Sequence, residues 1–267
     1  MLHPIVACWQ ILTKKYNTNL CIGLDPDLDL LPHGYAASIN GQTHFLKDVI
    51  DITREHCISY KPNLSFFESY GIDGLKSLEK VVKHIDDSTP IILDCKRGDI
   101  GNTATKQAQY IFDYFNADAS TLHPYMGYDS LEPFFKHKKK FHFILGLTSN
   151  SGSKDFEELT LKSNKTLAEH VVNQCVKWQH DHNNIGVVVG ADKQKLQTIR
   201  NIDPNLLFLI PGVGAQGGSY QTAATYGINN KNLAIINVTR NILYATDQRS
   251  ELKKVIPRVI KSILNQN

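Results

Sequence analysis

The chain has 267 residues, of which 42% are hydrophobic and 21% charged, proportions typical of a globular protein with a sizeable core. Its formal charge of +3 is too small to indicate nucleic acid or a membrane surface as a partner. The five cysteines are scattered without a CxxC pair, which argues against a disulfide framework or a zinc site. Met1 to Gln10 lacks the features of a secretory signal, and no apolar run reaches the roughly 18 residues of a membrane span. A soluble, cytoplasmic protein is therefore expected.

Along the chain, short apolar runs of strand length alternate with segments of helical spacing. The predicted strands cover residues 20–24, 57–60, 90–93, 118–122, 141–147, 185–189, 206–210 and 233–236. The predicted helices cover residues 4–16, 43–55, 71–85, 102–115, 130–140, 165–180 and 251–264, with shorter ones that begin at Asp192 and end near Tyr226.

This alternation predicts an α/β fold of the (β/α)8 TIM-barrel type, which typically needs about 250 residues. The alternative is a doubly wound open sheet, but its glycine fingerprint is missing after the first strand. No Pro/Gly-rich linker or change of composition divides the chain. Residues 1–267 are therefore expected to form a single barrel domain.

The stretch Asp94 to Thr103, DCKRGDIGNT, follows a buried strand and is rich in charge. Alternation along a strand places Asp94 and Lys96 on one face and Cys95 on the other. Asp99 follows at the turn into the next helix. Buried charges need opposite charges beside them, so the simplest interpretation is a structural ion pair. Their place at the carboxyl end of a barrel strand instead favours a functional site.

Several other predicted strands also end in polar residues, which a barrel gathers at one mouth. Asp25, Lys61 and Ser149 follow three of these strands, and Arg240 follows the last. The loop after the seventh strand reads PGVGAQGGS and offers backbone N–H groups and a helix amino terminus. Because barrel phosphate sites usually lie after strands seven and eight, this loop and Arg240 predict a phosphate-bearing substrate.

The motifs of other chemistries are missing from the sequence. Lysines stand between the carboxylates of the charged stretch, where a magnesium site would need further oxygen ligands, so no metal site is expected. There is no GxSxG elbow and no HExxH helix. His123 and His142 are interpreted as packing or rim residues. The lysine-rich segment Lys136 to Lys140 is expected to finish a helix, where positive charge suits the dipole, instead of binding a polyanion.

The charged stretch resembles the signature of the orotidine 5′-phosphate decarboxylases, which carry out the last step of de novo uridylate synthesis. The resemblance extends along the chain through LCIGLDPD, YKPN, LTSNSGS, PGVGAQGG and NVTRNILYA. The long first loop and the form of the glycine loop are similar to the longer bacterial branch of this family. DCKRGDIGNT is the specific motif, and the glycine and serine loops support it.

Carried over position by position, the resemblance implies a catalytic array of Lys61, Asp94, Lys96 and Asp99. Asp25 would hold the ribose hydroxyls and Ser149 would read the edge of the pyrimidine. The remaining implied substrate-binding residues are Ile100 and Thr103, and, for the phosphate, Arg240 with either Gln216 or Tyr220.

The resemblance also implies a mechanism without a cofactor, in which orotidine 5′-monophosphate loses CO2 to give UMP. The carbanion left on the pyrimidine ring would be stabilised electrostatically and then protonated, with Lys96 as the candidate for both tasks. In the family the active site is completed across a homodimer. Asp99, Ile100 and Thr103 are therefore expected to act in the partner subunit's site.

Two other functions remain open from the sequence. The first is a magnesium-dependent sugar-phosphate lyase or decarboxylase on the same scaffold, such as a hexulose-phosphate synthase, which shares the Asp-x-Lys-x-x-Asp spacing. The continuation from Ile100 to Thr103 and the TSNSGS loop favour the pyrimidine enzyme over it. The second is a non-catalytic phosphate-binding barrel, which has no need for four alternating charges.

Overall fold

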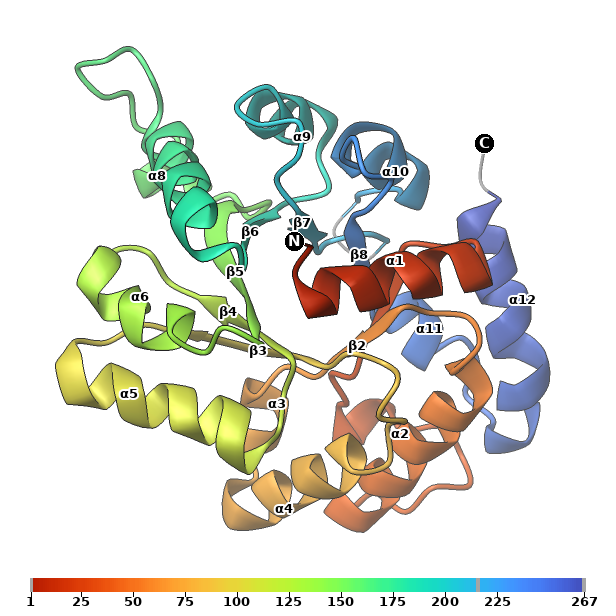
Figure 1. Cartoon of the computed structure of the whole chain (residues 1–267). Coiled ribbons are helices and arrows are strands. Elements are labelled where there is room, and N and C mark those ends of the chain that lie inside the picture. Colours follow the sequence, from red (N-terminus) through yellow and green to blue (C-terminus); the bar gives the residue numbers. More distant parts are fainter. Residues whose placement is uncertain (1, 215–216, 266–267) are drawn as a thin grey trace.

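The computed structural model describes residues 2–214 and 217–265, and it confirms the predicted (β/α)8 barrel (Figure 1). All the paired strands run parallel, in the order β2-β1-β8-β7-β6-β5-β4-β3. The strands are β1 (Leu20–Gly23), β2 (Ser59–Lys61), β3 (Ile92–Arg97), β4 (Ala119–Leu122), β5 (Phe141–Leu147), β6 (Ile185–Val189), β7 (Phe208–Ile210) and β8 (Ile235–Val238).

Helices surround this ring of strands (Figure 1). The long ones are α1 (Pro4–Tyr16), α2 (Ile39–Thr53), α4 (Gly71–Val82), α5 (Gly101–Gln109), α6 (Tyr128–Phe135), α8 (Leu167–His182), α9 (Lys193–Arg200), α10 (Tyr220–Gly227) and α12 (Leu252–Leu264). Three helices of four residues, which the sequence pattern did not predict, lie just after strands β2, β5 and β8, and they are α3 (Ser65–Glu68), α7 (Ser153–Phe156) and α11 (Arg240–Leu243).

The barrel closes between β2 and β3 through a short set of backbone hydrogen bonds. The Tyr60 N–H donates to the Pro90 carbonyl at 3.2 Å, and the Asp94 N–H donates to the Pro62 carbonyl at 2.9 Å. Pro62 has no N–H of its own and cannot extend a regular ladder. The Leu64 N–H instead donates to the Asp94 carbonyl at 3.1 Å. The seam between β2 and β3 is therefore held next to Lys61 and Asp94.

A separate hydrophobic core fills the inside of the barrel, and α1 closes its amino-terminal end (Figure 1). Trp9 is fully buried and packs edge-on against Phe141, with ring centroids 5.6 Å apart. Phe143 on the same strand and Leu12 on the helix complete the contact. Because this end is plugged, the open end of the barrel is the one where the strands finish.

The lysine-rich segment does not lie where the sequence predicted it. Helix α6 ends at Phe135, and residues 136–140 form turns that lead into β5. The helix ends earlier because the chain must return to β5, where the Phe141 N–H donates to the Asp118 carbonyl at 2.9 Å. In the described ranges, 2–214 and 217–265, no helix combines the length and apolar character needed to cross a membrane.

Candidate active site

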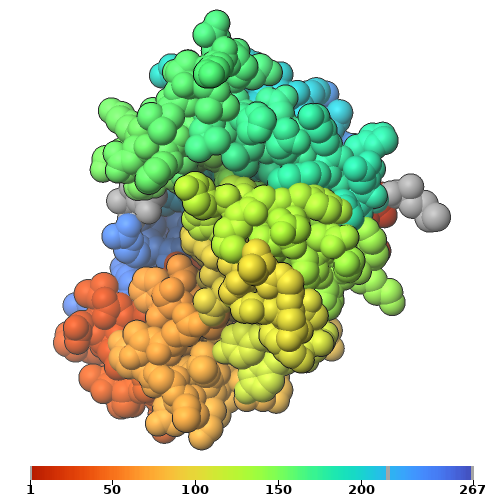
Figure 2. All heavy atoms as spheres, turned by 90° about the vertical axis from the view of Figure 1, so that its left-hand side faces the viewer, coloured from red at the N-terminus to blue at the C-terminus, as the bar shows by residue number. Residues whose placement is uncertain are grey.

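A cavity of about 550 Å³ opens where the strands end. Its lining includes the predicted residues Asp25, Lys61, Asp94, Lys96, Ser149 and Arg240. Apolar side chains such as Leu145, Val188 and Val213 line the rest of it. Seen from the side, a recess separates the green middle of the chain from the orange segment near its start, with the blue carboxyl-terminal part behind (Figure 2).

Asp94 lies at the centre of the charged residues in this cavity. Its Oδ2 accepts a hydrogen bond from Lys61 Nζ at 2.6 Å, and its Oδ1 accepts one from Lys96 Nζ at 2.6 Å. Thr121 Oγ1 also donates to Oδ1, at 2.8 Å. The Lys61 side chain is only 4% exposed, whereas that of Lys96 is 45% exposed. Lys61 is thus a buried counter-charge, and Lys96 is the ammonium group accessible from the cavity.

The pKa values of the buried pair are shifted in opposite directions. Burial alone would raise the pKa of Asp94, but the ammonium groups of Lys61 and Lys96 outweigh burial and hold that pKa well below its usual range. Burial would lower the pKa of Lys61, but the negative charges of Asp94 and Asp25 raise it above its usual value. Both groups therefore stay charged at neutral pH, and the array keeps its alternating signs.

Because β3 is irregular near its end, the side chain of Lys96 turns back toward Asp94. The pairing of β3 with β4 shifts register between Leu93 and Arg97, and Lys96 has a left-handed backbone with φ = 43°. Such a conformation is strained for a residue with a side chain and needs support from its surroundings. Thr121 of β4 supplies it, because its Oγ1 accepts hydrogen bonds from the N–H groups of Cys95 and Lys96, both at 3.0 Å.

Asp25 is the second carboxylate of the cavity, and three strands hold it. Its Oδ1 accepts a hydrogen bond from the Asn63 N–H at 3.0 Å, and its Oδ2 accepts one from Thr239 Oγ1 at 3.3 Å. Gly23 leaves the space for that hydroxyl, since a Cβ at Gly23 would lie 1.9 Å from Thr239 Oγ1. Burial raises the pKa of Asp25, and the nearby ammonium of Lys61 opposes this effect.

The second half of the charged stretch lies outside the lining of this cavity. Asp99 is half-buried and its Oδ1 accepts the N–H of Ile100 at 2.8 Å, while Ile100 and Thr103 are exposed. These three residues do not line the cavity of their own chain. Gln216, one of the two expected phosphate ligands, lies outside the described residues.

The structure corrects the expectation for Tyr220, the other expected phosphate ligand. Its side chain is buried, and its hydroxyl accepts the Asn19 N–H at 3.0 Å and pairs with Thr18 Oγ1 at 3.3 Å. Both partners precede β1, at the end of the strand opposite Asp25. Tyr220 is therefore a packing residue of the closed end. The sequence could not show this, because Tyr220 follows the glycine loop directly.

Asn63, Thr121 and Thr239 are site residues that sequence reasoning missed. Each is polar and lies in the last two positions of a strand or just after one, which is a weak signal because many residues share it. Their roles depend on contacts across strands, between β4 and β3 for Thr121 and between β8 and β1 for Thr239. His142 is fully buried among aromatic rings and lies away from the cavity, as predicted for a packing residue.

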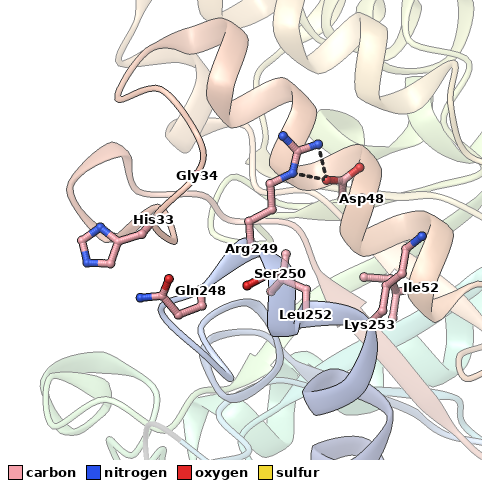
Figure 3. A pocket seen from close by; sticks show the side chains of 9 residues that line it. All are labelled: His33, Gly34, Asp48, Ile52, Gln248, Arg249, Ser250, Leu252 and Lys253. Carbon is pink, nitrogen blue, oxygen red and sulfur yellow. Dashed lines mark hydrogen bonds and ion pairs between the residues drawn. The ribbon is translucent and has the colours of Figure 1, made fainter.

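A second cavity, of about 620 Å³, lies between the first loop and the carboxyl-terminal segment (Figure 3). Arg249 donates to Asp48 from Nε at 3.1 Å and from Nη2 at 3.0 Å. The Tyr35 hydroxyl donates to the same carboxylate at 2.5 Å, and the His33 N–H donates to the Asp247 carbonyl at 2.6 Å. The charges here pair with one another and hold the long first loop in place, so this cavity serves the fold.

The carboxylates of the candidate site are not arranged as metal ligands. Among residues 2–214 and 217–265, no group of three His, Cys, Asp or Glu side chains could hold a metal ion. Both oxygens of Asp94 already accept hydrogen bonds from lysines. A divalent cation at Asp94 would have to displace an ammonium group that is itself held by that charge.

Fold and site together define a TIM-barrel enzyme with a Lys–Asp–Lys array at its mouth. A family model described as "Orotidine 5'-phosphate decarboxylase / HUMPS family" matches residues 18–255. The orotidine 5'-phosphate decarboxylase of Christiangramia forsetii is 41% identical over 242 residues, which cover 89% of this chain and 88% of that protein. The chain therefore belongs to the orotidine 5'-phosphate decarboxylase / HUMPS family.

Solved structures agree with this relationship. The OMP decarboxylase of Leishmania donovani superposes with a TM-score of 0.83 at 33% identity, covering 97% of this chain and 98% of that one. The UMP synthase of the same organism gives a TM-score of 0.85 at 35% identity over 98% of this chain. That protein is longer, and this chain spans 57% of its length.

We expect the contacts of Thr121 to stabilise the irregular end of β3. A Thr121→Val change keeps the shape but removes the donor to Asp94 and the acceptor for two backbone N–H groups. Because unpaired buried polar groups cost about 1–3 kcal/mol each, the loss of an acceptor for two N–H groups should lower the free energy of unfolding by at least about 2 kcal/mol. Urea unfolding followed by circular dichroism measures this, with Thr121→Ser as the control that should stay near wild type. Equal stability of the valine variant and the wild type would contradict this role.

Proposed function

We propose that the protein decarboxylates orotidine 5′-monophosphate to UMP, as a step of de novo pyrimidine biosynthesis. The observation that carries this proposal is the cavity-facing ammonium of Lys96, held 2.6 Å from a carboxylate that is itself neutralised by Lys61. The named relatives and the family match point to the same substrate.

The chemical difficulty of this reaction is a negative charge. Loss of CO2 leaves an electron pair in the plane of the pyrimidine ring, where no π system delocalises it. A positive charge fixed in advance stabilises such a species better than water, because nothing has to reorganise as the charge develops. Lys96 is that charge in our proposal, and it then transfers a proton from Nζ to the ring carbon as general acid.

Asp94 and Lys61 act on Lys96 in this mechanism. Asp94 fixes the direction of the Lys96 side chain, and the buried Lys61 keeps Asp94 ionised. The negative charge of Asp94 can also press against the substrate carboxylate before CO2 leaves. We give the electrostatic stabilisation of the carbanion the larger part, since the Lys96 ammonium is in place before CO2 leaves and keeps its charge until it protonates the ring carbon.

The rest of the cavity is assigned to the non-reacting parts of the substrate. Arg240, which lines the cavity after β8, would bind the phosphate together with Gln216 and backbone N–H groups of the glycine loop. Asp25 would accept hydrogen bonds from the ribose hydroxyls, and Ser149 would contact the pyrimidine edge. Binding energy from the phosphate can then be used to close the site over the ring.

We further propose that the working unit is a homodimer with shared sites. Asp99, Ile100 and Thr103 do not line the cavity of their own chain, although they directly follow its central motif. Ile100 is a large apolar residue and is 57% exposed. A partner subunit whose cavity received these side chains would bury Ile100 and extend the charge array by Asp99.

The structure disfavours the other two candidate functions. A magnesium-dependent sugar-phosphate lyase needs carboxylate oxygens free for the metal, and both oxygens of Asp94 accept hydrogen bonds from lysines. A non-catalytic phosphate-binding barrel gives no reason to bury Lys61 and Asp94, since burying a charge pair costs desolvation energy.

The direct test follows the absorbance of orotidylate with the purified protein, with and without EDTA. We expect turnover that EDTA does not reduce, whereas loss of activity in EDTA would show that the reaction depends on a metal ion. Absence of turnover under both conditions would overturn the proposal.

Replacing Lys96 by Ala should lower kcat/KM by at least about 10³-fold, because one residue supplies both charge and proton. The thermal unfolding midpoint checks that this variant remains folded.

The shared site can be tested by mixing two inactive proteins. Lys96→Ala and Asp99→Ala subunits should each be inactive alone. If Asp99 serves the partner's site, one of the two sites in a mixed dimer carries neither change, so the mixture should recover up to about a quarter of wild-type activity. This expectation is a statistical estimate for free exchange between two-fold symmetric dimers. Native mass spectrometry confirms the exchange, and mixed dimers without activity would refute the cross-subunit placement.

A further inference from the structure

The loop that carries Ser149 is held from outside by a lysine of helix α9. This loop, residues 148–158, begins where β5 ends and contains α7. Lys195 lies on α9 and reaches across to it. Its Nζ donates to the Thr148 carbonyl at 2.8 Å, to Ser153 Oγ at 3.0 Å and to Glu158 Oε1 at 2.9 Å. All three donor positions of one ammonium group are therefore used on a single loop.

The partners of Lys195 are also bonded to each other. The hydroxyl of Ser153, which is buried, donates to Glu158 Oε1 at 2.6 Å. The neighbouring Glu157 holds the start of the loop from its other side, since it accepts the Thr148 N–H at 2.7 Å and the Thr148 hydroxyl at 2.9 Å. Both the N–H and the carbonyl of Thr148 are thus tied to charged side chains.

Gly190, which directly follows β6, packs closely against Ser149. A Cβ at Gly190 would lie 2.8 Å from the Cβ of Ser149 and 2.9 Å from its backbone nitrogen. The Gly190 N–H also donates to the Leu147 carbonyl at 2.8 Å. Only a glycine lets the strand end approach this closely. Ser149 therefore lies between a strand end packed against it and a peptide fixed by Lys195.

Fixing the Thr148 carbonyl fixes Ser149 because both belong to one peptide group. The peptide is planar and trans, so the N–H of Ser149 must point to the side opposite the carbonyl, away from Lys195. If the carbonyl turned, the Ser149 N–H and the start of its side chain would turn with it. A charged donor suits this task because a hydrogen bond from an ammonium group is stronger than a neutral one.

We propose that Lys195 is a positioning residue for recognition of the pyrimidine base. It touches no substrate, and acts by holding the Thr148–Ser149 peptide in the orientation that lets Ser149 distinguish one base edge from another. This inference rests on the proposed function, in which Ser149 faces the base. Uracil presents a carbonyl oxygen at its fourth carbon and cytosine an amino group, so a fixed N–H donor favours uracil.

The test compares binding of UMP, CMP and ribose 5-phosphate to the full-length protein by isothermal titration calorimetry. Lys195→Met keeps an unbranched side chain only one atom shorter but loses the ammonium. It should reduce the preference for UMP over CMP by about tenfold or more, because small misplacements of a binding group have effects of this size. Affinity for ribose 5-phosphate, which has no base, should stay within about twofold of wild type.

Two further variants make the outcome specific. Lys193→Met, two positions earlier on α9, removes an exposed lysine whose Nζ lies over the Tyr226 ring, and it should keep the wild-type preference. Glu158→Gln leaves the Lys195 bond to the Thr148 carbonyl and should reduce the preference less than Lys195→Met. If Lys195→Met does not fold, Glu158→Gln still has to shift the preference in the same direction.

An unchanged ratio of UMP to CMP affinity in folded Lys195→Met would overturn the proposal, as would an equal loss of affinity for all three ligands. A failure of the proposed function gives a different result. If the wild type prefers UMP but does not turn over orotidylate, the reaction is refuted, whereas base recognition by this loop still stands. A wild type without preference for UMP refutes the role of Lys195 directly.

Discussion

The buried carboxylate of Asp94 constrains how the residues at the mouth of the barrel are arranged. Lys61 and Lys96 together keep Asp94 charged at this depth, and Lys96 has no other carboxylate within ion-pair distance among the described residues. Three strands have to end at matched heights for these side chains to meet, since Lys61 comes from β2, Asp94 and Lys96 from β3, and Thr121 from β4. The barrel supplies this alignment because parallel strands bring their carboxyl ends together.

The supports around this array act on the backbone more than on the charges themselves. Thr121 holds the irregular end of β3 that turns Lys96 toward Asp94, and Gly23 allows Thr239 to reach Asp25. Lys195 fixes the peptide that leads to Ser149. In each case a contact between separate parts of the chain holds a site residue in place. Such supporting contacts are what keep a catalytic group in its productive geometry.

The strands and the mouth residues could be predicted from sequence because each depends on local information. Apolar runs located all eight strands, and the polar residue after a run located Asp25, Lys61 and Ser149. Contacts between distant segments could not be found in this way. Thr121 and Thr239 look like ordinary strand-end residues until their partners are known. Tyr220 was misplaced because nothing local shows that its hydroxyl turns toward Asn19, and α6 ended early because of the return to β5.

The central claim is that Asp94 stays ionised between two lysines, and its titration tests this most directly. Selective ¹³C labelling of aspartate, with Asp94→Asn for assignment, lets NMR follow the carboxylate as the pH is lowered. Since the folded-state pKa is depressed, Asp94 adds stability that is fully present above its unfolded pKa and is lost as the pH falls from there through the folded value. We expect the Asp94 signal to remain that of the ionised form at every pH at which the protein is folded. A midpoint at or above the ordinary value of 3.8 would contradict the account.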